Sequence, residues 1–284
     1  KIQYHMDEPL ADPAAIALYF VCELASRQLK VVLSGEGADE IFGGYNVYSE
    51  PNSTAYDKLP RGLRRGIGTI AGKLPAKRGV NFFVRKGKDL EERFIGNAYM
   101  FTPAERSALL KAPGKAPDPT VITKPFYDKV KDQDDVTKMQ YLDLHLWQPL
   151  DILRKADRMT MANSLELRVP YLDREVWKVA RAIPSELKMS GKSTTKVPLR
   201  QAAIPLLPDD WIKRPKVGFP VPFIQWLREE KYYNWAKDLL SQDYVAEFFD
   251  RDYLLDLLER HYSGQEKTHR KLYTVLSFLI WYQV

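Results

Sequence analysis

The sequence contains only one cysteine, Cys22, and four histidines among its 284 residues. A single cysteine excludes an internal disulfide and any zinc site built on several cysteines. The histidines, at positions 5, 145, 261 and 269, lack the spacing of metal ligands. Cys22 lies in the apolar run of residues 17–22, which predicts a small buried hydrophobe rather than a reactive thiol.

A long apolar run is also missing, since the best candidate, residues 11–24, is interrupted by Asp12, Pro13 and Glu23. A membrane span needs about 20 consecutive apolar residues, so we expect none. No signal peptide pattern is visible, and we expect a cytoplasmic protein. The first residue is Lys1 rather than methionine, which indicates an excised piece whose native start lies elsewhere.

The excess of positive charge is modest, with 43 basic against 37 acidic residues and a net charge of +6. It is concentrated between positions 58 and 93, where the cations are Arg61, Arg64, Arg65, Lys73, Lys77, Arg78, Arg85, Lys86 and Lys88. A nucleic-acid surface would interleave aromatic residues for base stacking, and only Phe82 and Phe83 qualify. The pattern therefore favours a solvated loop region and no nucleic-acid partner, although such a field would also attract an anionic substrate nearby.

The first 45 residues have the order of a parallel α/β unit. Asp12 and Pro13 are typical of a helix start, and this helix should end near residue 28. Its expected inward face consists of Ile16, Tyr19, Phe20, Val21 and Leu24. The short apolar segment 30–33 predicts a strand, followed by a glycine turn at 34–37 and a second helix from residue 38. Helix, strand, turn and helix in this order form the crossover unit of a parallel sheet.

Beyond residue 50 the patterns become mainly helical. Residues 51–123 are rich in glycine and proline and predict irregular structure, with helical pieces in 97–110 that include a capping box at 102–105, and a surface loop at 111–124. The helices predicted after residue 134 are 135–147, 150–163, 173–182, 196–203, 221–228, 250–262 and 267–281. The expected fold is therefore α/β: residues 1–50 form the edge of a parallel-sheet domain, and residues 51–284 form a large, mainly helical part that includes a loop at 214–222.

Three acids crowd the turn that follows the predicted strand: Glu36, Asp39 and Glu40. Ligands of open parallel sheets bind beyond the carboxyl ends of the strands, and the first free N–H groups of a helix favour phosphate. Gly35 and Gly37 would let the backbone come close to a bound group. Acids beside a phosphate site indicate a magnesium ligand and a proton acceptor. A capped turn with solvated acids is the alternative.

A second group lies on the predicted helix 150–163, where Asp151, Arg154 and Arg158 share one stripe at i, i+3 and i+7. Such a stripe suits an anionic substrate, but an exposed ladder of ion pairs gives the same pattern, and the sequence favours the ladder. Further on, Glu166 and Arg168 are flanked by apolar residues and are expected to be partly buried and paired.

The loop 214–222 is fixed by prolines and holds out one lysine, Lys216. A rigid loop of this kind is better suited to touching phosphate than to packing.

Together these segments resemble the synthetase domain of the class B asparagine synthetases, which is an ATP pyrophosphatase-like (PP-loop) domain. The matching pieces occur in family order over roughly the first 220 residues: 7–13 (Asp-Glu-Pro-Leu-Ala-Asp-Pro), 33–40 (Leu-Ser-Gly-Glu-Gly-Ala-Asp-Glu), 42–45 (Phe-Gly-Gly-Tyr), 158–162, 165–173 and 216–219 (Lys-Val-Gly-Phe). The superfamily also includes β-lactam synthetases and peptide-tailoring amide ligases.

The resemblance implies a two-step, magnesium-dependent reaction. The side-chain carboxylate of aspartate attacks the α-phosphorus of ATP, giving β-aspartyl-AMP and pyrophosphate, and ammonia then displaces AMP to give asparagine. By match, Ser34, Gly35 and Gly37 would contact ATP, Glu36 would take the proton from ammonia, and Asp39 would help to hold Mg²⁺.

Lys216 would neutralise charge that develops on the phosphate during adenylation. Asp151 and Arg154 align with a helix near the substrates.

Two family features are absent: the Ser-Gly-Gly-x-Asp-Ser pyrophosphate loop, and the amino-terminal cysteine of the glutaminase domain that supplies ammonia. Both normally lie upstream, so we expect a truncated chain that makes no asparagine by itself. The alternatives are a related ligase acting on another carboxylate and a catalytically silent binding module. A homodimer is compatible with the sequence.

Overall fold

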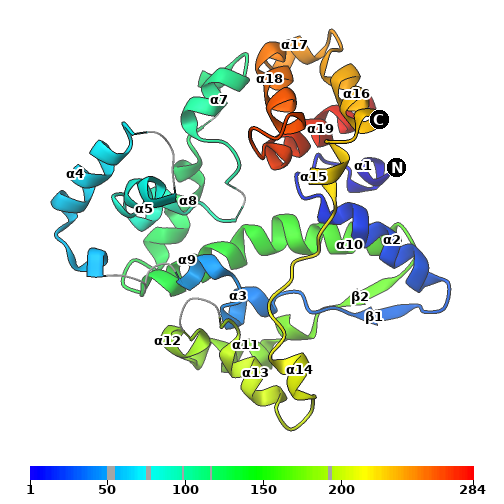
Figure 1. Cartoon of the computed structure of the whole chain (residues 1–284). Helices are drawn as coiled ribbons and strands as arrows, with labels where there is room; N and C mark the ends of the chain where they lie inside the picture. Colours follow the sequence, from blue (N-terminus) through cyan, green and yellow to red (C-terminus); the bar gives the residue numbers. More distant parts are fainter. Residues whose placement is uncertain (50–54, 75–77, 98, 116, 191–193) are drawn as a thin grey trace.

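The computed structural model describes residues 1–49, 55–74, 78–97, 99–115, 117–190 and 194–284. Within these ranges the chain is mainly helical and contains one small sheet of two strands, β1 (Val31–Leu33) and β2 (Glu166–Arg168). The strands are parallel, with Val31 opposite Glu166 and Leu33 opposite Arg168. The sheet lies at one side of the molecule, next to α2 (Ala14–Ser26) and α10 (Arg154–Met161) (Figure 1). A mainly helical α/β fold with a parallel sheet was expected, but the strand β2 was not.

The predicted order of the first elements is confirmed: α2, β1, a turn, and then α3 (Ala38–Phe42). Asp12 starts α2, because its Oδ1 accepts a hydrogen bond of 3.0 Å from the N–H of Ala14. The predicted inward face of α2 is wrong in part. Tyr19 is 3% exposed, but Phe20 is 59% and Leu24 is 65% exposed. Together with Val31 and Leu33 of β1, which are 41% and 73% exposed, these side chains form an uncovered apolar surface beside the sheet.

Residues 51–123 were expected to be irregular apart from helical pieces in 97–110. The helical pieces are confirmed by α7 (Pro103–Leu109), but for the rest of the described part the prediction of irregular structure is wrong. The helices in this region are α4 (Arg61–Ala71), α5 (Arg78–Lys86), α6 (Leu90–Arg93), α7 (Pro103–Leu109) and α8 (Pro119–Lys129). α4 and α5 pack closely where Gly68 faces Gly87. A Cβ on Gly68 would lie only 2.9 Å from the Cα of Gly87, so the contact needs a glycine. The sequence signal failed because the glycines that suggested loops are contact points between two helices.

Side chains of the basic cluster between positions 58 and 93 are held by ion pairs, unlike those of the solvated loop that was expected. Arg65 forms ion pairs of 2.8 Å with Asp89 and with Glu92, and Arg61 pairs with the same Asp89. The predicted capping box of α7 is confirmed, with Thr102 and Glu105 as its two members. The predicted surface loop 111–124 ends where α8 begins at Pro119.

The helical second half is confirmed in outline. The predicted helices correspond to α9 (Asp135–His145), a π-helical turn (Gln148–Leu153) continued by α10, α11 (Arg174–Ala182), α13 (Val197–Ala203), α15 (Phe223–Trp226), α18 (Arg251–Tyr262) and α19 (His269–Gln283). Not predicted were α1 (Ile2–Met6), α12 (Ser185–Lys188), α14 (Asp209–Ile212), α16 (Glu230–Leu240) and α17 (Val245–Phe248). Across the described ranges, no helix combines the length and the apolar character needed to cross a bilayer.

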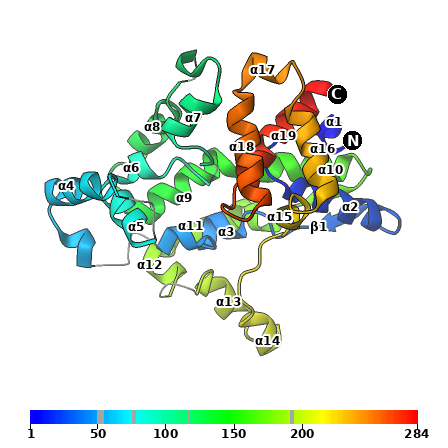
Figure 2. The same cartoon turned by 45° about the horizontal axis from the view of Figure 1, so that its top comes forward.

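The core consists of several separate clusters of buried apolar side chains. The largest joins α16, α18 and α19 and includes Leu240, Leu254 and Leu276. A second packs α9 against α8, and a third packs α1 and α2 against α10. Cys22 is buried and free, as expected. In Figure 1 the extended segment between α14 and α15 crosses the front of the molecule beside α3, and Figure 2 shows the same segment running from α14 to α15.

Candidate functional site

The turn after β1 exposes one glycine and buries another. Gly35 has open space where a Cβ would stand, so a ligand can approach its backbone. Gly37 has φ +88°, and a Cβ there would lie 2.3 Å from Leu172 Cδ2. The N–H of Ser34 donates to the carbonyl of Arg168 at 2.9 Å, and the Ser34 hydroxyl accepts from the N–H of Glu36 at 3.4 Å. Of the three residues matched to ATP contact, Gly35 therefore has the freest backbone, while Gly37 shapes the turn.

Glu36 is half-buried, and its carboxylate makes no hydrogen bond or ion pair within the described ranges. Burial raises the pKa of Glu36 above its ordinary value. Lys155 opposes this rise in pKa, while the negative charges of Asp39 and Asp12 add to it. A half-buried carboxylate with a raised pKa and no partner is a competent proton acceptor.

Asp39 is the meeting point of two lysines from distant parts of the chain. Lys216, from the loop 214–222, forms an ion pair with Asp39 Oδ1, and Lys196 Nζ lies 3.1 Å from the same oxygen. The Lys216 ammonium also lies 4.3 Å from the centre of the Tyr45 ring, a cation–π contact. The loop lysine and the acid cluster, which are 177 residues apart in sequence, are thus neighbours.

A buried polar network supports this surface from below. Glu40 is 1% exposed and accepts a hydrogen bond of 2.7 Å from the hydroxyl of Tyr45. The Gln148 amide lies 3.0 Å from both Glu40 carboxylate oxygens when its nitrogen is oriented toward them, and Trp147 Nε1 donates to the Tyr45 hydroxyl at 3.2 Å. The pKa of Glu40 is raised above its ordinary value, and burial is the main cause of this rise. Glu40 is therefore a structural acid, unlike its neighbours Glu36 and Asp39.

Beside Glu36 lies a second buried group, in which Lys155 bridges two carboxylates. Its ammonium pairs with Asp12 and lies 3.2 Å from Asp151 Oδ1. The Lys155 side chain is 6% exposed, and the two acids are 21% and 13% exposed. Burial raises the pKa of Asp151 to about 6, because one ammonium cannot compensate two carboxylates that have left water. This group joins the start of α2 to α10.

The arginines of the predicted stripe form ion pairs with the amino-terminal segment. Arg154 pairs with Glu8 at 2.7 Å, and Arg158 pairs with Asp7 at 2.8 Å. Asp151 instead turns toward Lys155. The sequence favoured an ion-pair ladder along the helix, but the partners of both arginines come from residues 7 and 8.

Glu166 and Arg168 are paired at 2.8 Å, as expected, but their side chains are 57% and 64% exposed. Partial burial was the wrong prediction. The two residues belong to β2 and their side chains point out of an uncovered sheet, where flanking apolar residues do not enclose them.

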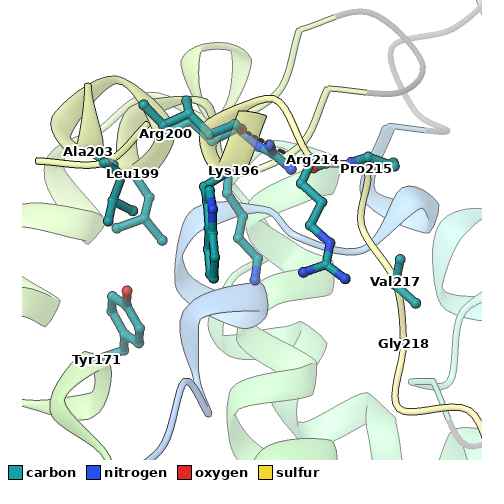
Figure 3. Close-up of a pocket in the computed structure, with 12 residues that line it drawn as sticks. Tyr171, Lys196, Leu199, Arg200, Ala203, Arg214, Pro215, Val217 and Gly218 are labelled. Atoms are coloured by element: carbon teal, nitrogen blue, oxygen red, sulfur yellow. Dashed lines mark hydrogen bonds between the residues drawn. The ribbon is translucent and has the colours of Figure 1, made fainter. Parts of the chain in front are cut away.

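A cleft of about 530 Å³ opens between α13 and the loop 214–222. Lys196, Arg200 and Arg214 line it, and no acid does so among the described residues. Figure 3 shows the side chains of Lys196 and Arg214 next to each other, both extending into this space. Arg200 Nη1 donates to the carbonyl of Arg214 at 3.0 Å and thereby anchors the start of the lysine loop.

The described residues contain no group of three or more His, Cys, Asp or Glu side chains that could hold a metal ion. Mg²⁺ commonly uses one or two carboxylates together with waters and substrate phosphates. Asp39 fits that mode through Oδ2, because only its Oδ1 is paired with the two lysines among the described residues and the side chain is 26% exposed.

Sequence reasoning missed Lys155 and Lys196 as members of the site. Lys155 had a weak signal, because it lies one helical turn after Asp151. Lys196 had none, since it reaches Asp39 only through the tertiary fold.

Known proteins resemble this chain along its whole length. The sequence profile of the family described as Asparagine synthase matches residues 1–283. The chain is 44% identical over 286 residues to glutamine-hydrolyzing asparagine synthetase 1 of Bacillus subtilis, covering all of this chain and 45% of that protein. A Mycobacterium bovis protein, provisionally named a glutamine-hydrolyzing asparagine synthetase, is 43% identical over 288 residues, covering all of this chain and 44% of its own length.

A more distant relative is the amidase chyE of Penicillium rubens, which is 27% identical over 250 residues and matches 78% of this chain and 37% of its own. The chain thus spans less than half the length of the relatives that it matches.

Proposed function

Because the chain belongs to the asparagine synthase family, we propose that it is the ATP-using part of an enzyme that converts aspartate to asparagine. The observation that carries the proposal is the meeting of Lys216 with Asp39 beside the unpaired carboxylate of Glu36. A cation from a distant loop, an acid suited to Mg²⁺ and a proton acceptor then share one open surface. The names of the relatives agree with this activity.

In the first step the aspartate side-chain carboxylate attacks the α-phosphorus of ATP and pyrophosphate leaves. Lys216 would move from Asp39 to the phosphate oxygens and neutralise the charge that grows there, a contribution worth about 3–4 kcal/mol when a single fixed donor is removed. The open space at Gly35 would let the nucleotide contact the protein backbone there. Asp39 would hold Mg²⁺, which supplies charge neutralisation at the phosphates when bound.

In the second step ammonia attacks the carbonyl of β-aspartyl-AMP, AMP leaves, and the new amide nitrogen loses a proton. Glu36 would accept that proton. Its raised pKa suits this role, because a carboxylate with a higher pKa is a stronger base. The negative charges of Asp39 and Asp12 near Glu36 would also stabilise the positively charged nitrogen that forms when ammonia attacks.

We further propose that residues 1–50 are the edge of an ATP pyrophosphatase-like domain whose other strands lie upstream in the parent protein. Parallel sheets are normally covered on both faces. Here Phe20, Leu24 and Leu33 leave an apolar surface uncovered beside a sheet of two strands. The pyrophosphate loop and the glutaminase domain would belong to the same upstream part, so the chain alone should release no pyrophosphate from ATP and aspartate.

A related ligase that acts on another carboxylate is the second candidate, because a relative that matches 78% of this chain has a name other than asparagine synthetase. The two candidates share the adenylation chemistry and differ in the acid that is activated.

The test is aspartate-dependent pyrophosphate release by the full-length protein, with a panel of carboxylates in place of aspartate. The proposal predicts release with aspartate above all others and formation of asparagine when ammonia is added. Release with another carboxylate only would assign the enzyme to the second candidate. Activity that persists unchanged in both Glu36→Gln and Lys216→Ala would leave a silent binding module as the role of this chain.

A further inference from the structure

Lys196 reaches the acid cluster in an unusual backbone conformation. Its φ is +55°, one of three positive values among the described non-glycine residues, and it stands immediately before α13. A non-glycine residue in this region carries strain that the surrounding structure must hold in place. The carbonyl of Thr195, directly before it, accepts a hydrogen bond of 2.8 Å from Arg200 Nε, and this contact fixes the local backbone.

The side chain of Lys196 passes through a space that only a glycine leaves open. A Cβ added at Gly44 would lie 2.5 Å from Lys196 Cε and 1.8 Å from Asp39 Oδ1. Gly44 is therefore required for the approach of this lysine to this carboxylate. Asp39 lies in α3 and Gly44 just after it, whereas Lys196 comes from the start of α13.

Asp39 Oδ1 thus has two lysine partners that are attached to different parts of the chain. Lys196 is attached to the start of a helix and is 24% exposed. Lys216 belongs to an extended loop whose anchors are Arg200 at its start and the contacts of Lys216 itself with Asp39 and Tyr45.

From this geometry we infer that Lys196 is a positioning residue: it holds the Asp39 carboxylate in place while Lys216 exchanges between Asp39 and the phosphates of ATP. The inference rests on the proposed function. If Lys216 left Asp39 with no second partner, the carboxylate would be free to rotate and would attract the lysine back. A fixed second ammonium weakens the hold of Asp39 on Lys216 and keeps the carboxylate aimed at the turn.

The sharing of Asp39 can be tested with this chain alone, by trace labelling of lysine amines followed by mass spectrometry. In Lys196→Met, Asp39 has only Lys216 left, so the Lys216 amine should be labelled about twofold to fivefold more slowly than in the unaltered chain. Asp39→Asn should accelerate the labelling of the Lys216 amine. Lys213, which pairs with Asp209 on the protein surface, is the internal control and should not change. An unchanged rate at Lys216 in Lys196→Met would overturn the inference.

The consequence for catalysis is tested in the full-length protein. Lys196→Met should lower kcat for pyrophosphate release about 10- to 100-fold and leave the KM for aspartate unchanged, as for other residues that orient a catalytic carboxylate. Lys196→Arg should recover part of the loss.

Gly44→Ala should lower kcat as Lys196→Met does. The double variant Lys196→Met with Gly44→Ala should have a kcat no lower than that of the less active single variant, because both substitutions remove the same contact. Should Gly44→Ala fail to fold, the Lys196 variants and the labelling still decide. Multiplicative losses in the double variant, or an unchanged kcat in Lys196→Met, would contradict the positioning role. If Lys216→Met also left the activity intact, the proposed function itself would fail.

Discussion

The buried bridge of Lys155 between Asp12 and Asp151 gives the sharpest prediction for stability. Lys155→Met removes the ammonium and leaves two carboxylates, 21% and 13% exposed, without their shared cation. Breaking a buried ion pair by removing one partner costs about 3–5 kcal/mol. For a chain of 284 residues such a loss lowers the melting temperature by about 5–8 °C.

The loss should depend on pH in a defined direction. Burial already raises the pKa of Asp151 to about 6, so the folded state holds that proton more tightly than the unfolded chain does. For an acid of this kind, stability is greatest below the unfolded pKa and falls as the pH rises through the folded pKa. Without Lys155 the pKa should rise further. The variant should therefore be closest to the unaltered chain near pH 5 and furthest from it near pH 8.

Thermal unfolding and urea unfolding, both followed by circular dichroism at pH 5, 6, 7 and 8, measure the melting temperature and the free energy of unfolding. Lys213→Met is the matched control, because its ion pair with Asp209 is more than 70% exposed on both sides and should contribute less than about 1 kcal/mol. Adding Asp151→Asn to Lys155→Met should restore most of the stability. A melting temperature within 2 °C of the unaltered chain at pH 8 would refute the reasoning.

Three further predictions follow from the same structure. In the full-length protein, Glu36→Gln should stop amide formation but keep aspartate-dependent pyrophosphate release. In the unaltered enzyme, amide formation should fall as the pH drops through the raised pKa of Glu36. Equal losses of both steps in Glu36→Gln would contradict the role of Glu36 as base. Gly37→Ala should destabilise the chain by about 1–3 kcal/mol in urea unfolding, because its Cβ would strike Leu172, whereas Gly35→Ala should change stability by less than about 0.5 kcal/mol; similar effects at both sites would be inconsistent with the turn geometry. Burial raises the pKa of Asp143 to about 7, so stability should fall between pH 4 and 8, and Asp143→Asn should flatten this dependence; an unaltered pH profile would be contrary evidence.

The elements nearest to the candidate site were predictable because their signals are local. Asp12 and Pro13 mark the start of α2, a short apolar run marks β1, and glycines mark the turn that follows. The sequence also singled out Glu36, Asp39 and Lys216 by residue type and spacing. Each of these inferences needs only a few neighbouring residues.

What the sequence could not supply were contacts between distant segments. The ladder expected along helix 150–163 was replaced by pairs between Arg154 and Glu8 and between Arg158 and Asp7, since the amino-terminal segment packs on that helix. The strand β2 was missed because three residues become a strand only when β1 lies beside them. The predicted inward face of α2 was wrong at Phe20 for a similar reason. An apolar side chain indicates that a packing partner exists, but it does not indicate which chain segment provides that partner.

The central claim is that Lys216 serves the chemistry at Asp39 and Glu36 from a loop far away in sequence. Its most direct test is the exchange of labelled pyrophosphate into ATP in the presence of aspartate, measured on the full-length protein with Lys216→Met and Lys213→Met side by side. Loss of a fixed cation at the developing phosphate charge should slow exchange by about 10²–10³ in Lys216→Met and leave Lys213→Met close to the unaltered enzyme. Equal exchange rates in the two variants would contradict the account.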